Sequence, residues 1–257
     1  MSCACLLIHG FAGSPFEMEA LVPGLEALGC TVDLPALPGH DAGLEAFKRS
    51  FFPDWLAFAE ERFLALCQKH DMVIPIGFSM GGSIALNIAA KHSAMPQTGG
   101  VVGLAPAHTI LNFPPKNKKE AWLWLTPVMQ YLKPQLDMAV NLAAQEIAPF
   151  KGIESPLCLP QLWSLIKGVA AMRSLLPNLH KALFLMYDLH DRVCPPENAL
   201  RIAKDVSSKD VTVRWLRMEE RVTSHHMLTT HRETRGKVAS EVAAFVARIA
   251  GHNQQAV

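Results

Sequence analysis

Apolar residues follow two patterns along this chain. Short, nearly continuous apolar runs, as expected for strands buried on both faces, occur at residues 4–8, 31–34, 72–76, 101–104, 183–187 and 211–216. Longer segments with the spacing and end signals of helices lie at residues 17–28, 53–68, 83–91, 196–206 and 233–249. Strands that alternate with helices in this way predict an α/β fold, with a mainly parallel sheet of about six strands flanked by helices.

The alternation stops between residues 108 and 180, where Pro, Trp, Met and Leu are frequent and no strand-like run occurs. We expect this segment to form several short helices, a cap inserted into a core made of residues 1–107 and 181–257. The large side chains of the segment are expected to fill the interior of the cap, to pack it on the core or to line a ligand pocket: Trp122, Trp124, Met129 and Trp163.

The composition indicates a compact body without a strongly charged surface. Half of the 257 residues are apolar and 18% are charged, with a formal net charge of +1. The one short basic cluster, at residues 116–119, is interpreted as a solvated loop. No apolar run approaches the roughly 18 residues that span a bilayer, so we expect neither a nucleic-acid partner nor integral membrane association.

The cysteines and the first apolar run indicate a cytoplasmic protein. That run lacks a basic segment before it and is too short for a signal peptide, so it is interpreted as a strand of the mature protein. Six cysteines without clustered spacing do not suggest a disulfide framework, and a reducing compartment is expected. Cys3 and Cys5 place both sulfur atoms on one face of the strand, where buried free thiols are expected.

A candidate nucleophile follows the third predicted strand. Gly77, Ser79 and Gly81 form a G-x-S-x-G sequence between that strand and a helix. This arrangement places a serine on a sharp turn above the sheet, and small flanking residues make room for the turn. The start of the helix also adds partial positive charge where an oxyanion would form. The strand–turn–helix context makes Ser79 the expected nucleophile.

A serine hydroxyl needs a base, and the base needs a carboxylate that orients it. In a sheet of this kind the acid follows a late strand and the histidine follows the last strand. Asp188 and Asp191 both lie in the loop after residues 183–187, and position favours Asp191. The loop after the last strand holds two adjacent candidates for the base, His225 and His226.

Acyl transfer also needs two N–H donors that stabilise the negative charge of the tetrahedral intermediate. The amide of Met80, directly after the proposed nucleophile, can supply one of them. The glycine-rich loop after the first strand can supply the other, and Phe11 is the expected residue. His9, which opens this loop, is interpreted as structural.

These motifs resemble those of the small bacterial carboxylesterases and monoacylglycerol lipases of the α/β-hydrolase superfamily. The resemblance rests on LIHGFAGSP at residues 7–15, LPGH at 37–40, GFSMGG at 77–82, HDRV with a following proline at 190–195, and SHH at 224–226. It implies the α/β-hydrolase fold and the Phe11 and Met80 amides as the oxyanion hole. The family's Ser-x-His motif fits only with His226 as the base. Asp41 departs from the family, which often has glycine there, and leaves the shape and charge of the acyl entrance open.

The sequence therefore predicts a serine hydrolase that cleaves hydrophobic carboxylic esters through an acyl-enzyme, with Ser79, His226 and Asp191 as its catalytic residues. No metal-binding histidine pair, phosphate-binding loop or dinucleotide fingerprint is present, so no cofactor is expected. A thioesterase, an acyltransferase, a carbon–carbon hydrolase or a peptidase of the same fold remains an alternative, because fold and catalytic residues fix the mechanism more than the substrate. A binding protein that keeps the hydrolase shell without catalysis is the remaining alternative.

Overall fold

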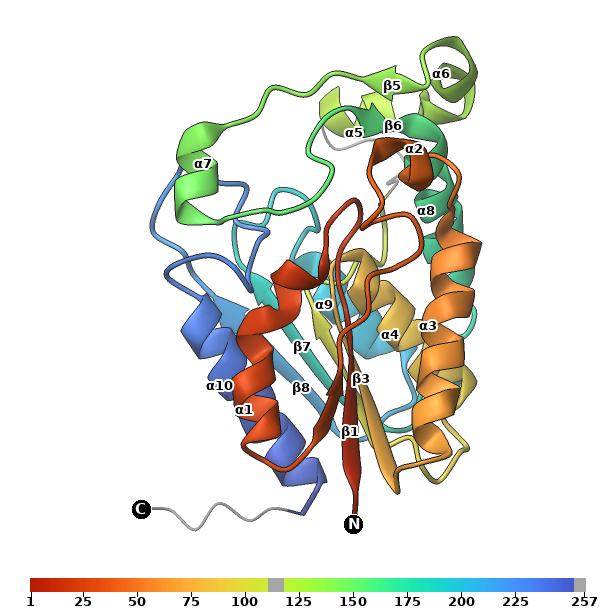
Figure 1. Cartoon of the computed structure of the whole chain (residues 1–257), viewed down its shortest axis with the longest axis vertical. Coiled ribbons are helices and arrows are strands. Elements are labelled where there is room, and N and C mark those ends of the chain that lie inside the picture. The colour runs from red at the N-terminus through yellow and green to blue at the C-terminus, as the bar shows by residue number, and fades with distance from the viewer. Residues whose placement is uncertain (111–117, 252–257) are drawn as a thin grey trace.

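A computed structural model describes residues 1–110 and 118–251 (Figure 1). The basic cluster at residues 116–119 lies outside the part whose side chains are described. Six parallel strands form the central sheet in the order β2-β1-β3-β4-β7-β8. The strands are β1 (Cys3–Ile8), β2 (Thr31–Asp33), β3 (Met72–Phe78), β4 (Gly100–Leu104), β7 (Ala182–Asp188) and β8 (Val211–Leu216). All six predicted strands and the α/β fold class are thus confirmed.

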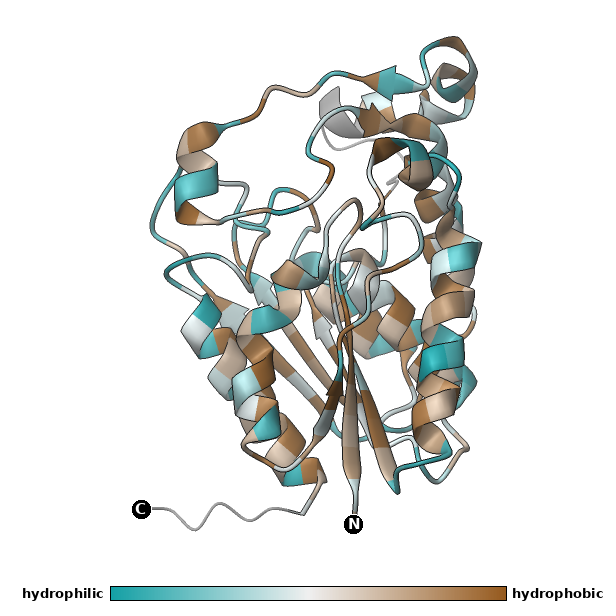
Figure 2. Ribbon diagram, in the orientation of Figure 1, coloured by the Kyte–Doolittle hydropathy of each residue, from teal (hydrophilic) through white to brown (hydrophobic). Residues whose placement is uncertain are grey.

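Helices cover both faces of the sheet. On one side α1 (Val22–Glu26) packs against α10 (Arg235–Ile249), and on the other α3 (Phe52–Cys67) packs against α4 (Met80–Lys91). The 3-10 turn η2 (Leu176–Asn178) contacts both α4 and α9 (Glu197–Asp205). Figure 2 shows hydrophobic residues along the central strands and hydrophilic ones on the outer turns of α3 and α10. This distribution follows from the nearly continuous apolar strands, which must be buried on both faces.

The segment predicted as one helix over residues 17–28 is divided in two. A 3-10 helix, η1 (Pro15–Leu21), comes first, and α1 follows directly. Pro23 explains the division, because proline lacks the N–H that a continuous helix needs and its ring clashes with the preceding turn. Pro23 therefore occupies the first turn of α1, where this N–H is not required.

The segment between β4 and β7 differs in part from the prediction. It contains α5 (Lys118–Leu123), α6 (Thr126–Leu132), α7 (Leu142–Ile147) and α8 (Leu159–Met172). It also contains two strands of two residues each, β5 (Gln135–Leu136) and β6 (Leu157–Cys158), which pair antiparallel. The prediction that this segment has no strands was wrong, because two-residue strands leave no periodic pattern in a sequence.

The large side chains of this segment do not all pack inward. Trp122 is 60% exposed and Trp124 is 41% exposed, so the expectation that they fill a core or pocket was wrong. Trp163 and Met129 are half-buried. The segment is anchored instead by α8, which packs on α3 and α4 through buried residues such as Leu165 and Val169. Among the described helices, none is long and apolar enough to cross a membrane.

Candidate active site

Ser79 occupies a sharp turn between β3 and α4. Its backbone angles are φ 53° and ψ −118°, a left-handed conformation that is costly for any residue with a side chain. The turn is possible because Gly77 and Gly81 lack a Cβ. A Cβ at Gly77 would lie 2.0 Å from the Gly81 carbonyl oxygen, and one at Gly81 would lie 2.1 Å from the Ile8 carbonyl oxygen. The two glycines are therefore required by the close approach of backbone to backbone.

The structure brings Ser79, His226 and Asp191 together at the carboxyl edge of the sheet. The Nε2 atom of His226 lies 2.8 Å from the Ser79 Oγ, and its Nδ1 lies 2.7 Å from Asp191 Oδ2. Both Asp191 and His226 are buried. The other Asp191 oxygen, Oδ1, accepts hydrogen bonds from the N–H groups of Val193 and Cys194. These bonds hold the Asp191 carboxylate in place and leave its Oδ2 for the imidazole.

The two residues that competed for these roles in the sequence form a separate pair. The ring of His225 lies between Asp188 Oδ1, 3.1 Å from its Nδ1, and the Glu220 carbonyl oxygen, 2.6 Å from its Nε2. Asp188 is fully buried, and its Oδ2 accepts the N–H of Met218. His225 has a φ of 59°, which turns its side chain away from that of its neighbour. The pair therefore ties the end of β7 to the loop that carries His226.

The loop after β1 lies beside this constellation. Its turn is closed by a hydrogen bond from the Gly13 N–H to the Gly10 carbonyl and by a φ of 57° at Ala12. Within the described residues, the Phe11 N–H has no acceptor, while the phenyl ring packs edge-on against Phe47 and Trp55. Met80 is the first residue of α4, so its N–H has no acceptor within the helix. Both amides expected to form the oxyanion hole are thus available as donors.

Glu17, in η1, is hydrogen-bonded to the same loop. It is 1% exposed, and its Oε2 accepts the Gly10 N–H at 2.7 Å. Burial raises the pKa of Glu17 to about 7, while the Gly10 hydrogen bond and the charge of His226 act in the opposite direction. His9 has the structural role that was expected, because its Nε2 accepts the Leu37 N–H and its Nδ1 lies 2.9 Å from the Gly10 carbonyl oxygen.

A cavity of about 480 Å³ adjoins the site. It includes Phe11 and Ser224 but not Ser79, so it meets the candidate active site at the loop after β1 and the loop before His226. Its other lining residues come mainly from the segment between β4 and β7 and are mostly apolar: Ala12, Phe47, Met138, Ala139, Asn141, Ala144, Phe150, Ile153, Glu154, Pro156, Leu157, Cys158, Val222 and Thr223. Asp41 is exposed and is not part of this lining. The size and apolar walls suit a small hydrophobic ligand.

Comparison with known proteins identifies the family. The family model described as serine aminopeptidase, S33, matches residues 2–218. The chain belongs to the S33 family. As an S33 protein it has the α/β-hydrolase fold, and the resemblance to bacterial lipases and carboxylesterases found in the sequence is confirmed.

Curated relatives of this S33 protein include two bacterial esterases. A thermostable monoacylglycerol lipase from a Bacillus species is 28% identical over 229 residues, which cover 87% of this chain and 82% of the lipase. A carboxylesterase from Bacillus subtilis is 24% identical over 247 residues, which cover 96% of this chain and 93% of that enzyme.

Solved structures share the fold of this S33 protein. One, from work on the metagenome-derived lipolytic enzymes LipS and LipT, has a TM-score of 0.81 and 22% identity, covering 96% of this chain and 94% of its own. A soluble variant of the monoglyceride lipase of Saccharomyces cerevisiae, in complex with a substrate analogue, has a TM-score of 0.76 and 17% identity. That likeness covers 97% of this chain and 87% of the yeast structure.

Two residues of the site were not found from the sequence. Glu17 lies in a segment predicted as an ordinary helix, and nothing in the local pattern marks it as buried. The thiol of Cys194 contacts the Ser79 hydroxyl, and burial raises its pKa well above the ordinary value, as does the charge of Asp191. Cys194 lies in the same loop as Asp191, but its contact with Ser79 depends on how that loop folds back over the sheet.

Proposed function

We propose that this S33 protein hydrolyses carboxylic esters with hydrophobic acyl groups, such as monoglycerides or short- and medium-chain esters. The observation that carries the proposal is the continuous contact from Ser79 through His226 to Asp191, with distances of 2.8 Å and 2.7 Å. This is the geometry in which an imidazole can accept a serine proton while a carboxylate stabilises the charged ring.

In the proposed reaction the Ser79 Oγ attacks the ester carbonyl carbon as His226 Nε2 takes its proton. The amides of Phe11 and Met80 hold the oxyanion, and each such donor typically contributes about 3 kcal/mol to the transition state. The alcohol leaves with the proton from His226, and an acyl-enzyme remains. A water molecule then gives a proton to His226 and attacks the acyl carbon. The bond from the acyl carbon to Ser79 Oγ breaks as His226 returns the proton to that oxygen, which releases the acid and restores the Ser79 hydroxyl.

We further propose that residues 108–180 act as a cap that shapes the acyl site. Two backbone hydrogen bonds support this role. The Ile153 N–H donates to the Ala12 carbonyl at 2.7 Å, and the Arg232 N–H donates to the Ile147 carbonyl at 3.0 Å. The segment is thereby joined to the loop after β1 and to the loop that follows His226. Its apolar side chains on the adjoining cavity favour a hydrophobic acyl group.

A peptidase is the second candidate, because the matching family model is described as a serine aminopeptidase. An aminopeptidase needs a negative group near the substrate's ammonium. Glu154 is the one charged side chain among the described residues that line the cavity, and it is exposed. The predominance of apolar residues around it favours the ester over the aminoacyl amide.

The test compares hydrolysis of p-nitrophenyl esters of increasing acyl length with aminoacyl p-nitroanilides and matched thioesters. Wild type is expected to prefer esters of short to medium chains. Ser79→Ala and His226→Ala should each lower kcat/KM by about a thousandfold or more. His225→Asn, which keeps a polar side chain at a position with positive φ, is expected to lose less than about tenfold. Faster hydrolysis of the anilides, or full activity in Ser79→Ala, would overturn the proposal.

A further inference from the structure

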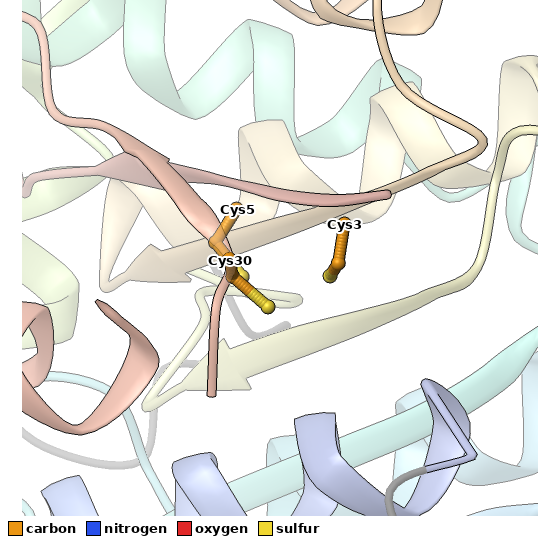
Figure 3. A group of neighbouring side chains, drawn as sticks. All are labelled: Cys3, Cys5 and Cys30. Atoms are coloured by element: carbon orange, nitrogen blue, oxygen red, sulfur yellow. The ribbon is translucent and has the colours of Figure 1, made fainter. Parts of the chain in front are cut away.

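Three of the six cysteines gather at the amino edge of the sheet, at the end opposite to the candidate active site. Cys3 and Cys5 are two residues apart on β1 and therefore point to the same face. Ala4 pairs with Thr31 in the parallel register, so Cys30, directly before β2, lies opposite Cys3. The three Sγ atoms all lie within 4.8 Å of one another. Figure 3 shows the three side chains on one side of the strands, with their sulfur atoms turned toward each other.

We propose that Cys3, Cys5 and Cys30 form a binding site for a soft, thiophilic metal ion, Cu(I), held by three sulfur atoms. A three-coordinate ion with metal–sulfur bonds of about 2.3 Å requires sulfur atoms about 4 Å apart. The three sulfur atoms lie within 4.8 Å of one another, slightly farther apart than that spacing. A small rotation of each side chain about χ1 closes the difference. The thiols are therefore already arranged for the ion.

The chemistry of the donor atoms selects the metal. No histidine, aspartate or glutamate of the described chain joins the three sulfurs as a further ligand. Sulfur is a soft ligand that favours Cu(I) and Zn(II) over hard ions such as Mg²⁺ and Ca²⁺. A structural zinc site normally has four protein ligands, whereas Cu(I) is stable with three. The set of three thiols therefore suits Cu(I) better than Zn(II).

The position of the cluster protects the ion and still gives it access. Cys5 is fully buried and Cys3 and Cys30 are each 4% exposed, so the sulfurs are shielded from water and from oxidants. The chain neighbours Ser2 and Thr31 are exposed, which places the cluster one residue below the surface. β2 is moreover an edge strand of the sheet, and it can move without breaking the pairing of the other strands.

Without the ion the thiols of Cys3 and Cys5 are protonated. A hydrogen bond with Cys30, together with burial, raises the pKa of Cys3 to about 12. The pKa of Cys5 is raised by its hydrogen bonds with Cys3 and Cys30 and by burial. Each thiol that becomes a thiolate ligand must release its proton to water, while the copper stays in the +1 state and no electron is transferred. The apparent affinity should therefore rise about tenfold per pH unit for each proton released.

The test is an anaerobic titration of the full-length, reduced protein with Cu(I) in competition with a chromogenic Cu(I) chelator. Wild type should retain a single Cu(I) per chain and develop a sulfur-to-copper charge-transfer absorption. Cys3→Ser, Cys5→Ser and Cys30→Ser should each weaken binding by at least tenfold. Cys67→Ser is the matched control, because Cys67 is a buried thiol at the end of α3 outside the cluster, and its binding should equal that of wild type.

Circular dichroism and thermal melts show whether each variant is folded, and Cys5→Ala replaces Cys5→Ser if the buried hydroxyl prevents folding. The proposal is overturned if wild type loses all its copper to the chelator. It is also overturned if Cys67→Ser weakens binding as much as Cys3→Ser, or if Zn(II) displaces Cu(I) from the protein. Ester hydrolysis should be unchanged in the three cysteine variants of the cluster, because none of these residues contacts the candidate active site.

Discussion

Glu17 is a buried carboxyl group that interacts with two parts of the candidate active site. It accepts the Gly10 N–H in the loop that carries Phe11, and its pKa of about 7 is lowered by the charge of His226. The two groups therefore attract each other when Glu17 is ionised and His226 carries a positive charge. In the proposed mechanism His226 is protonated in the transition state. Ionised Glu17 should therefore accelerate the reaction.

We expect Glu17→Gln to be as active as wild type well below pH 7 and about fivefold slower well above it. The amide oxygen can still accept the Gly10 N–H, but the negative charge that forms above the pKa of Glu17 is lost, at a cost of about 1 kcal/mol. The measurement is kcat/KM of both proteins across the pH range. Their ratio cancels the titration of groups that the two proteins share.

Glu17→Ala serves as the comparison, since it removes the acceptor as well as the charge. It should be slower than wild type at every pH, because the buried Gly10 N–H is left without a partner. If the kcat/KM of wild type divided by that of Glu17→Gln is constant across pH, the charge of Glu17 does not act on His226.

Residues differed in how far the sequence could place them. Ser79 was predictable because the sharp turn that carries it is local in sequence and requires glycine on both sides, at positions 77 and 81. His225 and His226 could not be distinguished by position alone, and only the family motif favoured His226. What separates them is the φ of 59° at His225, which sends the two side chains in different directions. Such a backbone angle depends on tertiary contacts, here those of His225 with Asp188 and Glu220.

At the scale of the elements, α8 is held against the core by a close contact with α3. A Cβ at Gly168 would lie 2.0 Å from the Phe52 ring, and the Phe52 N–H donates to Ser164 Oγ at 3.2 Å. Gln161 adds a hydrogen bond to the Lys48 carbonyl at 2.7 Å. Helix α8 therefore approaches α3 closely at a glycine and is fixed there by side-chain hydrogen bonds.

We expect Gly168→Ala to destabilise the protein by about 1–3 kcal/mol, because the added methyl group must displace the buried Phe52 ring or the helix. Gly236→Ala, in α10, should have the opposite sign. A Cβ at Gly236 would meet no atom within 4 Å. Alanine is favoured over glycine by about 1 kcal/mol in a helix interior and by less at Gly236, the second residue of α10. Denaturant unfolding of both variants measures the two changes. Equal stability of Gly168→Ala and wild type would show that α8 can adjust freely.

The elements that the sequence predicted best are those with strong periodic signals. The four inner strands of the sheet, β1, β3, β4 and β7, are apolar almost throughout. α3 begins where Pro53 and Asp54 suggest, with the Asp54 carboxylate accepting the Phe51 N–H at 2.8 Å. β5 and β6 could not be predicted, since each has two residues and depends on a partner about 20 positions away. The exposure of Trp122 was likewise unpredictable, because hydrophobicity alone does not say which face of a short helix is covered.

Four buried or hydrogen-bonded groups with strongly shifted pKa values should make the stability of the whole molecule depend on pH. Burial lowers the pKa of His9 to about 3, with a further contribution from the charge of His40, and burial lowers that of His40 to about 4. Their ring centroids are 4.8 Å apart. Burial raises the pKa of Glu17 to about 7. Glu220 is affected by burial, which raises its pKa, but hydrogen bonds from Thr223 and Val222 outweigh it and lower the pKa to about 2.

The sign of each contribution follows from which state binds the proton. Between about pH 6.5 and 4.5 the unfolded chain protonates His9 and His40, whereas the native state protonates Glu17. The unfolded state thus binds about one more proton, and the free energy of unfolding should fall by about 1.4 kcal/mol per pH unit on acidification. Below about pH 4.5 the unfolded chain also protonates Glu17 and Glu220, while the native state begins to protonate His40 and then His9. The excess therefore rises only to about two protons near pH 4, and the decline steepens there.

Urea unfolding at a series of pH values measures this curve, and two variants test its origin from opposite sides. Glu17→Gln removes the one group that favours the native state on acidification, so its slope between about pH 6.5 and 4.5 should double. His40→Asn removes one of the two opposing histidines, so its slope there should approach zero. His40 Nε2 is buried and has no hydrogen-bond partner among the described residues. Removing this nitrogen in the Asn variant therefore breaks no hydrogen bond. If the free energy of unfolding has the same pH slope in wild type and both variants, other groups control acid unfolding. A steeper slope in Glu17→Gln and a flatter one in His40→Asn would instead assign acid unfolding to the residues that surround the loop after β1.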